Sequence, residues 1–373
     1  MPRFLALTSR GLEPAVHEEL LELGFKNLKV VSLGVEFESN WEGCYRANFW
    51  LRSATRVVLP ILDFPAYQAD DLYHNLKKHD FTKYIRPDQT LAVDGKTRLS
   101  NVFRDQRFLA LKTKDAIVDQ FRDKFGVRPN VDTKNPDLRV MVRVVKTDVS
   151  VAIDTSGESL AHRGYRKVSV MAPVREHMAA GLLRLADWKT DTAIVDPMCG
   201  SGTFLIEAAL RAMGRPPGGR RTEYGFMKML GFQPEAWAKV RAEGLKARGA
   251  QVRLLGFDRD PSAIRAAQEN ARQAGVESLV SFKVMDVKAL KRQGPTGLVI
   301  TNPPYAERIG LVEKMRETYG ELAQTLKREF VGWDCWLLSG NEELTQGLKL
   351  KAERKIRVFN GTLDCRLLHY PIR

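Results

Sequence analysis

The sequence predicts an α/β protein whose C-terminal half is a mainly parallel sheet covered by helices on both faces. From Ala193 onward, short buried strands, turns and helices alternate, which is typical of parallel strands joined by crossover helices. The dipeptide Asn360-Gly361 joins two strand-like segments and predicts a terminal hairpin that contributes one antiparallel strand. Residues before 160 mix short strands and helices differently, which predicts α+β units in front of this sheet.

The N-terminal part divides into two predicted units and a junction. Residues 1–60 have the pattern of a ferredoxin-like element, with a strand (4–8), a helix (14–23), a hairpin (28–32 and 35–38) and a helix (41–51). Residues 61–160 form the second unit, with a helix (70–78), a strand (91–94), a long helix (103–125) and an antiparallel pair (139–145 and 149–154). Residues 161–185 are a linker that ends in a helix from about 175.

The C-terminal domain, residues 186–373, contains five predicted sheet strands before the hairpin. These strands are 193–195, 254–257, 280–284, 298–301 and 335–338. The hairpin strands are 356–359 and 365–369, and the helices are 203–212, 234–247, 262–274 and 313–330. Residues 214–232 are rich in Gly, Pro and Arg and predict a loop.

Charge indicates the class of partner. The chain has 373 residues, of which 44% are hydrophobic and 28% charged, as in ordinary globular proteins. The formal net charge is +14, with +3 in residues 1–165 and +11 in residues 166–373. This excess favours a polyanionic partner such as RNA, because Lys and Arg gain affinity by displacing counterions from phosphates.

Membrane and metal sites are not expected. No apolar run approaches the roughly 20 residues that span a bilayer. The N-terminus turns polar too soon for a signal peptide, so we expect a cytoplasmic protein. Separately, we expect the protein to be a monomer. Four cysteines form no CxxC pair and have no histidine cluster beside them, so we expect reduced thiols and no metal: Cys44, Cys199, Cys335 and Cys365.

A glycine turn follows the first strand of the C-terminal domain and opens a helix. It reads Asp196, Pro197, Met198, Cys199, Gly200, Ser201, Gly202 and Thr203. Its glycines let the backbone approach a ligand, and N–H groups at the helix start can bind a carboxylate. The third glycine of GxGxxG is missing and there is no GxxxxGK[ST] pattern, which argues against dinucleotide and NTPase sites. S-adenosylmethionine, a nucleoside without pyrophosphate, fits this turn.

Two acids occupy equivalent positions after the next two strands. Asp258 ends the second strand and could accept both ribose hydroxyls, since a carboxylate accepts several hydrogen bonds. Asp286 follows the third strand and could accept a hydrogen bond from the adenine amino group. Either acid could instead cap the next helix, although Asp260 beside Pro261 is the better N-cap candidate.

The tetrapeptide Asn302-Pro303-Pro304-Tyr305 follows the fourth strand and is the most specific motif. An aryl amine is a poor nucleophile because its lone pair is delocalised into the ring. The side-chain carbonyl of Asn302 and the backbone carbonyl of Pro303 could accept hydrogen bonds from the amine, and the prolines fix this backbone beforehand. Tyr305 offers a flat face for an extruded base. The motif therefore predicts methyl transfer to an exocyclic amine.

With His162-Arg163-Gly164-Tyr165-Arg166, these motifs resemble the methyltransferases that carry an N-terminal THUMP domain. The likeness to the RlmL type covers nearly the whole chain, through TSRGLE (8–13), KDAIVD (114–119), RPNVD (128–132) and NGTLDC (360–365). It implies a Rossmann-like methyltransferase domain, a THUMP RNA-binding domain at 61–160, and methylation of a guanine N2 amine in 23S rRNA or a pre-ribosomal particle. It also implies that Asp258, Asp286 and Asn302 line the cofactor.

Basic and aromatic side chains outside these motifs are candidates for RNA contact. They are Lys112, Lys114, Arg163, Tyr165, Arg166, Arg220 and Arg221. The two lysines could equally belong to a solvated face of mixed charge. The junction residues Arg163, Tyr165 and Arg166 could instead pin two domains together.

Other functions stay open at this point. A tRNA guanine could be the substrate, and the same tetrapeptide also occurs in enzymes that methylate DNA adenine or a protein glutamine amide. A non-catalytic RNA-binding or ribosome assembly protein is a further alternative. The missing third glycine weakens the hypothesis that the protein is a nicotinamide-dependent dehydrogenase.

Overall fold

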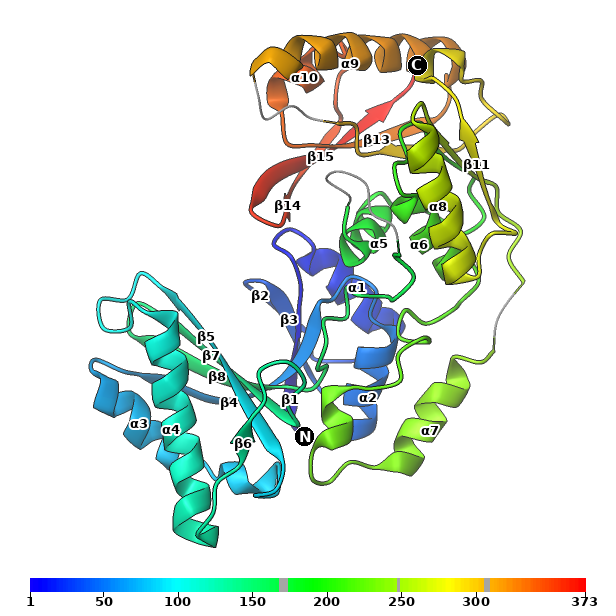
Figure 1. Ribbon diagram of the computed structural model, residues 1–373. Coiled ribbons are helices and arrows are strands. Elements are labelled where there is room, and N and C mark those ends of the chain that lie inside the picture. Colours follow the sequence, from blue (N-terminus) through cyan, green and yellow to red (C-terminus); the bar gives the residue numbers. More distant parts are fainter. Residues whose placement is uncertain (168–173, 247–248, 305–308) are drawn as a thin grey trace.

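The computed structural model describes residues 1–167, 174–246, 249–304 and 309–373, and contains one β-sheet in each half of the chain. The N-terminal sheet has eight strands in the order β2-β3-β1-β4-β8-β7-β5-β6, and the C-terminal sheet has seven. Figure 1 shows the two sheets in different parts of the molecule, with α1 and α5 in contact between them. Among the described helices, none combines the length and apolar character needed to cross a bilayer.

The first part of the N-terminal sheet follows the predicted ferredoxin-like order. Its elements are β1 (Arg3–Leu7), α1 (Glu13–Glu22), β2 (Lys29–Val31), β3 (Gly34–Glu38) and α2 (Trp41–Trp50). Asn40 caps α2 by accepting a hydrogen bond from the Gly43 N–H group at 2.9 Å. Apolar side chains of β1, α1 and α2, such as Phe4, Val16 and Tyr45, form a common core.

Strand β4 (Arg56–Pro65) was not predicted, and it joins the two N-terminal units into one sheet. Its beginning pairs with β1 and the rest pairs with β8, so the strand crosses position 60, where the sequence predicted a boundary. Pro60 lies at a register shift between β4 and β8. A proline lacks the N–H group that a regular ladder requires, which explains both the bulge and the missed strand.

The second N-terminal unit packs two helices on one face of the sheet (Figure 1). Its elements are α3 (Ala69–Lys77), β5 (Thr90–Arg98), α4 (Gln106–Phe125), β6 (Asn130–Val131), β7 (Leu138–Val145) and β8 (Asp148–Asp154), with a 3-10 turn, η1, at Phe81–Lys83. Alternate residues of β7 and β8 point into this core, as the predicted period of two requires.

The C-terminal sheet has the predicted mainly parallel topology, in the order β11-β10-β9-β12-β13-β15-β14. Its strands are β9 (Ile194–Asp196), β10 (Leu254–Asp258), β11 (Val280–Val284), β12 (Leu298–Thr301), β13 (Asp334–Ser339), β14 (Arg354–Asn360) and β15 (Leu363–Pro371). Strand β15 runs antiparallel to both of its neighbours, which confirms the expected hairpin strand. The predicted α/β fold class is therefore correct.

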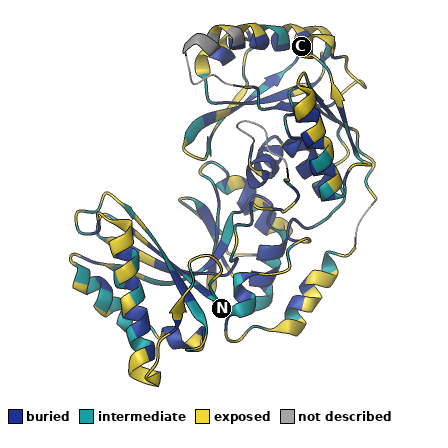
Figure 2. Cartoon of the chain, in the orientation of Figure 1, coloured by how far each residue is buried: buried dark blue, intermediate teal, exposed yellow. Residues whose placement is uncertain are grey.

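Helices cover both faces of this sheet. On one face lie α5 (Glu176–Leu185), α6 (Thr203–Ala212) and α8 (Pro261–Ala274), and on the other lie α9 (Ile309–Glu329) and α10 (Glu342–Gln346). Figure 2 shows that the buried residues of both halves concentrate where helices meet sheets, whereas α4 and α7 expose one face to solvent.

The segment between α6 and β10 packs against the N-terminal half and is not a free loop. It contains η2 (Gly225–Lys228) and α7 (Pro234–Glu243), which ends earlier than predicted. Tyr224, Phe226 and Trp237 enter the core of the first N-terminal unit. The backbone N–H of Leu230 donates to the Tyr84 carbonyl at 2.8 Å. This segment, residues 213–246, is called the insertion below. Its contacts connect the C-terminal half to the N-terminal half.

Candidate cofactor and catalytic site

Four parallel strands bring the predicted motifs to one edge of the C-terminal sheet. Strand β9 lies between β10 and β12, so the strand order reverses there, and ligands of such sheets bind at the carboxyl ends beside the reversal. A cavity of about 460 Å³ occupies this position. The predicted residues that line it are Pro197, Met198, Gly200, Asp258, Asp286, Asn302, Pro303 and Pro304.

The glycine turn after β9 depends on two left-handed residues. Gly200 and Gly202 have φ values of +51° and +80°. A Cβ atom on Gly202 would lie 2.6 Å from the Phe282 ring, so no other residue fits there without a shift. The Cys199 N–H donates to the Phe257 carbonyl at 2.8 Å, which fastens the turn to β10. The turn is thus a rigid backbone cradle at the cavity edge.

Asp258 connects the turn to the strand beside it. One carboxylate oxygen accepts a hydrogen bond from the Gly200 N–H at 3.0 Å, and the other accepts one from the Asp260 N–H at 3.0 Å. Because a carboxylate has about four lone-pair sites, Asp258 keeps acceptor capacity for a ligand. Asp260 caps α8 by accepting from the Ser262 N–H at 2.8 Å, as predicted.

Asp286 is exposed and lines the cavity after β11, the strand beside that of Asp258. Its Oδ1 accepts a hydrogen bond from the Lys288 N–H at 3.0 Å and caps a short 3-10 turn, η3 (Val287–Ala289). The capping role that the sequence left open is therefore real, and it leaves the second oxygen of Asp286 available to a ligand.

Several residues of the predicted cofactor turn support it from behind and do not line the cavity. Asp196, Cys199, Ser201 and Thr203 are buried. The Oδ1 atom of Asp196 accepts a hydrogen bond from the Met198 N–H at 3.2 Å. Burial raises the pKa of Asp196 to about 7, although this hydrogen bond favours the charged form. These side chains shape the turn, and direct ligand contacts are left to Pro197, Met198 and Gly200.

The asparagine of the tetrapeptide presents an unsatisfied acceptor at the cavity. Asn302 is partly buried, and its Oδ1 atom is inaccessible to solvent with no hydrogen-bond partner among the described residues. A buried carbonyl without a partner is costly, so Asn302 is a candidate to accept a hydrogen bond from a bound ligand. Pro303 is buried and Pro304 is exposed, while Tyr305 lies outside the described residues.

Further side chains line the cavity and were not predicted as site residues, among them Met285, Thr318 and Glu321. Met285 directly precedes Asp286, and its soft thioether is suited to a flat ring, so its position after β11 was an available signal. Thr318 and Glu321 lie three residues apart on α9 and therefore share a face. No local pattern marks them, because they reach the cavity only through the way α9 crosses the sheet.

The junction residues Arg163 and Tyr165 are buried, so the prediction that they contact RNA is wrong. Arg163 is 3% exposed and donates to the backbone carbonyls of Leu160 and Arg52. Tyr165 is 1% exposed and its hydroxyl donates to Glu207 at 3.0 Å. Their contacts join the N-terminal half to α6, which is the domain-pinning role that the sequence left open.

Arg166 connects the same junction to the glycine turn. Its guanidinium donates to Thr203 Oγ1 at 3.0 Å and to Glu176 at 3.1 Å. Because Thr203 is the first residue of α6, this contact fixes the start of the helix behind the cavity. Arg166 therefore supports the glycine turn from the junction, and an RNA contact by this side chain stays a prediction.

The predicted RNA contacts on α4 are engaged in ion pairs. Lys112 lies 3.1 Å from Asp70, and Lys114 lies 2.8 Å from Asp115. This arrangement matches the solvated face of mixed charge that the sequence left open, so RNA contact by these lysines stays a prediction.

The two arginines of the insertion differ from each other. Arg221 donates to the carbonyls of Ser156, Glu158 and Ser159, so its role is structural. Arg220 is exposed and donates to the Gln273 carbonyl.

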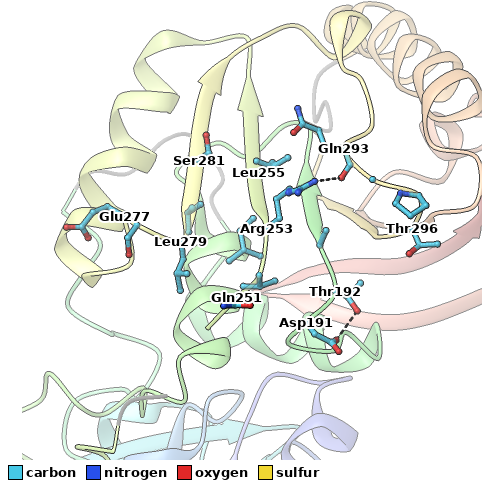
Figure 3. Close-up of a pocket in the computed structure, with 17 residues that line it drawn as sticks. Asp191, Thr192, Gln251, Arg253, Leu255, Glu277, Leu279, Ser281, Gln293 and Thr296 are labelled. Atoms are coloured by element: carbon cyan, nitrogen blue, oxygen red, sulfur yellow. Dashed lines mark hydrogen bonds between the residues drawn. The ribbon is translucent and has the colours of Figure 1, made fainter. Parts of the chain in front are cut away.

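A second cavity, of about 1030 Å³, opens at the amino ends of the same strands (Figure 3). It is lined by residues that lie just before, or at the beginning of, these strands. One of them, Arg253, donates a hydrogen bond to the Gln293 carbonyl at 2.8 Å. None of the predicted site residues lines it, and parallel sheets do not bind ligands at this end, so its size does not make it the site. Within the described residues, no three His, Cys, Asp or Glu side chains are grouped as a metal site.

Comparison with known proteins gives three matches of family models. The RMKL-like methyltransferase domain matches residues 163–369, the THUMP domain matches 66–154, and the RlmL ferredoxin-like domain matches 3–58. The first model covers more than half of the chain. The three matches follow the order in which the sequence predicted its units.

Relatives match over the whole chain. Ribosomal RNA large subunit methyltransferase K/L of Syntrophotalea carbinolica is 38% identical over 99% of this chain and 53% of its own length. The protein of the same name from Vibrio campbellii is 36% identical over 100% of this chain and 54% of its own length. The chain thus spans about half the length of these curated relatives. A solved methyltransferase in complex with SAH is 30% identical with a TM-score of 0.91, covering 100% of this chain and 98% of that one.

Proposed function

The chain belongs to the RMKL-like methyltransferase family, and from this premise we propose that it transfers a methyl group from S-adenosylmethionine to the exocyclic N2 amine of a guanine in RNA. The favoured substrate is 23S rRNA, because the full-length matches are ribosomal RNA large subunit methyltransferases. The single observation that carries the chemistry is the buried, unpartnered Oδ1 of Asn302 at the edge of the cavity.

The residues around the cavity fit the proposed cofactor. Gly200 and Gly202 keep the turn free of side chains that would block a close approach. Asp258 would accept the ribose hydroxyls with its remaining lone pairs, and Asp286 would accept from the adenine amino group. When bound, S-adenosylmethionine supplies a methyl group that its sulfonium charge has already activated.

Asn302 orients the target amine and stabilises the charge that forms on its nitrogen. Its Oδ1 atom accepts a hydrogen bond from the target amine, and the Pro303 carbonyl offers a second acceptor. These acceptors stabilise the positive charge that develops on the nitrogen during attack, and they need no rearrangement because the prolines hold the backbone. The proton can leave to solvent after transfer, so no strong base is required at the site.

The N-terminal half supplies the RNA-binding part of the proposal. A match to the THUMP domain supports an RNA partner, and the net charge of +14 is consistent with it. The bounds 1–60, 61–160, 161–185 and 186–373 remain our proposed domain limits. We also propose that the protein acts as a monomer in the cytoplasm, since one chain supplies every wall of the cavity.

The test uses purified protein, S-adenosylmethionine with a labelled methyl group, and total RNA from cells that lack the gene. We expect label in 23S rRNA as N2-methylguanosine, detected by mass spectrometry of nucleosides, and labelling at least about 100-fold slower with Asn302→Ala. Label in tRNA would move the substrate to tRNA. If calorimetry detects no S-adenosylmethionine binding while RNA still binds, the protein is a non-catalytic RNA-binding factor and the proposal fails.

A further inference from the structure

Two adjoining cavities form a groove between the second N-terminal unit and the insertion. Their volumes are about 420 and 440 Å³. They share lining residues, so they are parts of one depression, which is called the interdomain groove below. The shared residues are Asn135, Pro136, Gly157, Glu158, His162 and Gly225.

Three separate segments build the groove and hold its width. One wall is the loop before β7 and the other is the insertion, and Lys228 of the insertion donates to the Asn135 side chain at 2.9 Å across them. The floor is backbone, since a Cβ atom on Gly225 would lie 2.8 Å from the Asp154 carbonyl. The Phe226 N–H donates to the Thr155 carbonyl at 2.9 Å, which fixes the insertion to this floor. The groove is therefore formed before any partner arrives.

The charge of the groove favours an anion. Seven of its lining residues are Lys or Arg and four are Asp or Glu. Asp154 pairs with Arg56, and Glu158 lies 3.0 Å from His162. Among the cations, Arg139 pairs with Asp94 and Arg163 with Glu207, so within the described residues the unpaired charges of the groove are mainly those of its lysines and of Arg220. In the part of the chain that the structure describes, no ion pair engages Lys134, Arg220 or Lys228. This differs from α4, where both predicted RNA-binding lysines have carboxylate partners.

We propose that the interdomain groove binds the sugar–phosphate backbone of the RNA substrate, an inference that rests on the proposed function. Lys134, Arg220 and Lys228 are the cations that would contact phosphates, with release of the counterions held there. Tyr224, the tyrosine of this lining, is 2% exposed and offers no free face for a base, so contact is with the backbone and not with base sequence.

The location of the groove suits a strand that continues to the catalytic cavity. The insertion leaves the C-terminal domain at the end of α6, and the same helix begins at the glycine turn. Helix α6 has ten residues and is therefore about 15 Å long. An RNA strand in the groove is thus held by a segment that is directly continuous with the cofactor cradle.

The experiment compares two sets of charge reversals in the full chain. Binding of a fluorescein-labelled single-stranded RNA of about 20 nucleotides is followed by anisotropy over a range of KCl concentrations. We expect K134E/R220E/K228E to bind about a hundred-fold more weakly, with a salt slope reduced by about 2, because three phosphate contacts are lost. K26E/K29E, at exposed positions that line neither cavity of the groove, is the matched control and is expected to stay within about three-fold of wild type.

SAH affinity, measured by calorimetry, shows whether each variant is folded, and it is expected to be unchanged in both. Because Lys228 also ties two walls together, Lys134→Glu alone is a second variant, and its exposed side chain makes misfolding no explanation for its loss of affinity. Wild-type affinity in the folded groove variants, or an equal loss in the K26E/K29E control, would overturn the inference. Failure of wild-type protein to bind SAH would refute the proposed function instead.

Discussion

Replacing Asn302 by Ala separates catalysis from stability. The Oδ1 atom has no hydrogen-bond partner in the described part of the chain, so its removal costs the folded protein no hydrogen bond. We therefore expect the free energy of unfolding to change by less than about 1 kcal/mol. Loss of one preorganised polar group that acts in the transition state lowers kcat by about 100- to 1,000-fold, or ~3–4 kcal/mol. Affinity for S-adenosylmethionine should stay within a few-fold.

The assay is single-turnover methyl transfer at saturating cofactor, combined with urea unfolding of the same samples. Asn48→Ala is the matched control, because Asn48 is buried but satisfied: its Nδ2 donates to the Cys44 carbonyl and to Thr155, each at 3.0 Å. This control should lose about 1–3 kcal/mol of stability and keep its kcat. The reasoning is refuted if Asn302→Ala turns over like wild type, or if its activity falls only in proportion to the folded fraction.

Three further predictions concern the cofactor turn. Asp258→Ala should weaken S-adenosylmethionine binding at least about ten-fold in calorimetry, because it removes a ribose acceptor worth over 1.4 kcal/mol; an unaltered Kd would exclude that role. Gly202→Ala should cost about 1–3 kcal/mol in urea unfolding, since φ is +80° and the Cβ atom would lie 2.6 Å from Phe282. Gly24→Ala, with a similar φ of +84° but no described atom within 4 Å of the Cβ position, should cost less, and equal losses would contradict the clash. Burial raises the pKa of Asp196 to about 7, so the stability it contributes is complete below its ordinary value of 3.8 and is lost as pH rises through about 7. Asp196→Asn should remove a slope of up to ~1.4 kcal/mol per pH unit between these values, and identical pH profiles of unfolding would disprove it.

The cofactor edge was predictable because short-range patterns specify it. The glycine turn, the acids after β10 and β11, and the tetrapeptide after β12 each follow a strand that its own apolar run identifies. Once the strands are parallel, their carboxyl ends must meet at one edge. The family expected from these motifs is confirmed by the family models. The ligand and catalytic roles of the individual residues stay predictions.

Other features depend on partners far away in the sequence. The sequence leaves the role of Arg163 open between RNA contact and domain pinning, because nothing near it predicts the Arg52 carbonyl and Glu207 that surround it. The Arg-rich insertion resembled an RNA-binding loop, although its aromatic residues Tyr224, Phe226 and Trp237 belong to a core that the N-terminal half completes. Burial decides such cases, and burial is a property of the assembled fold.

Strand β4 holds the two N-terminal units at a fixed spacing. One uninterrupted strand belongs to both units, and the described parts of the insertion and of the buried junction tie them to the C-terminal domain. The proposed RNA groove and the proposed reaction site are therefore parts of one connected framework. The span between the two points is then set by the protein. Under the proposed function, a guanine that lies one helical step too near or too far along the RNA would miss the cavity, so we expect the choice of substrate to depend on length as well as on base chemistry.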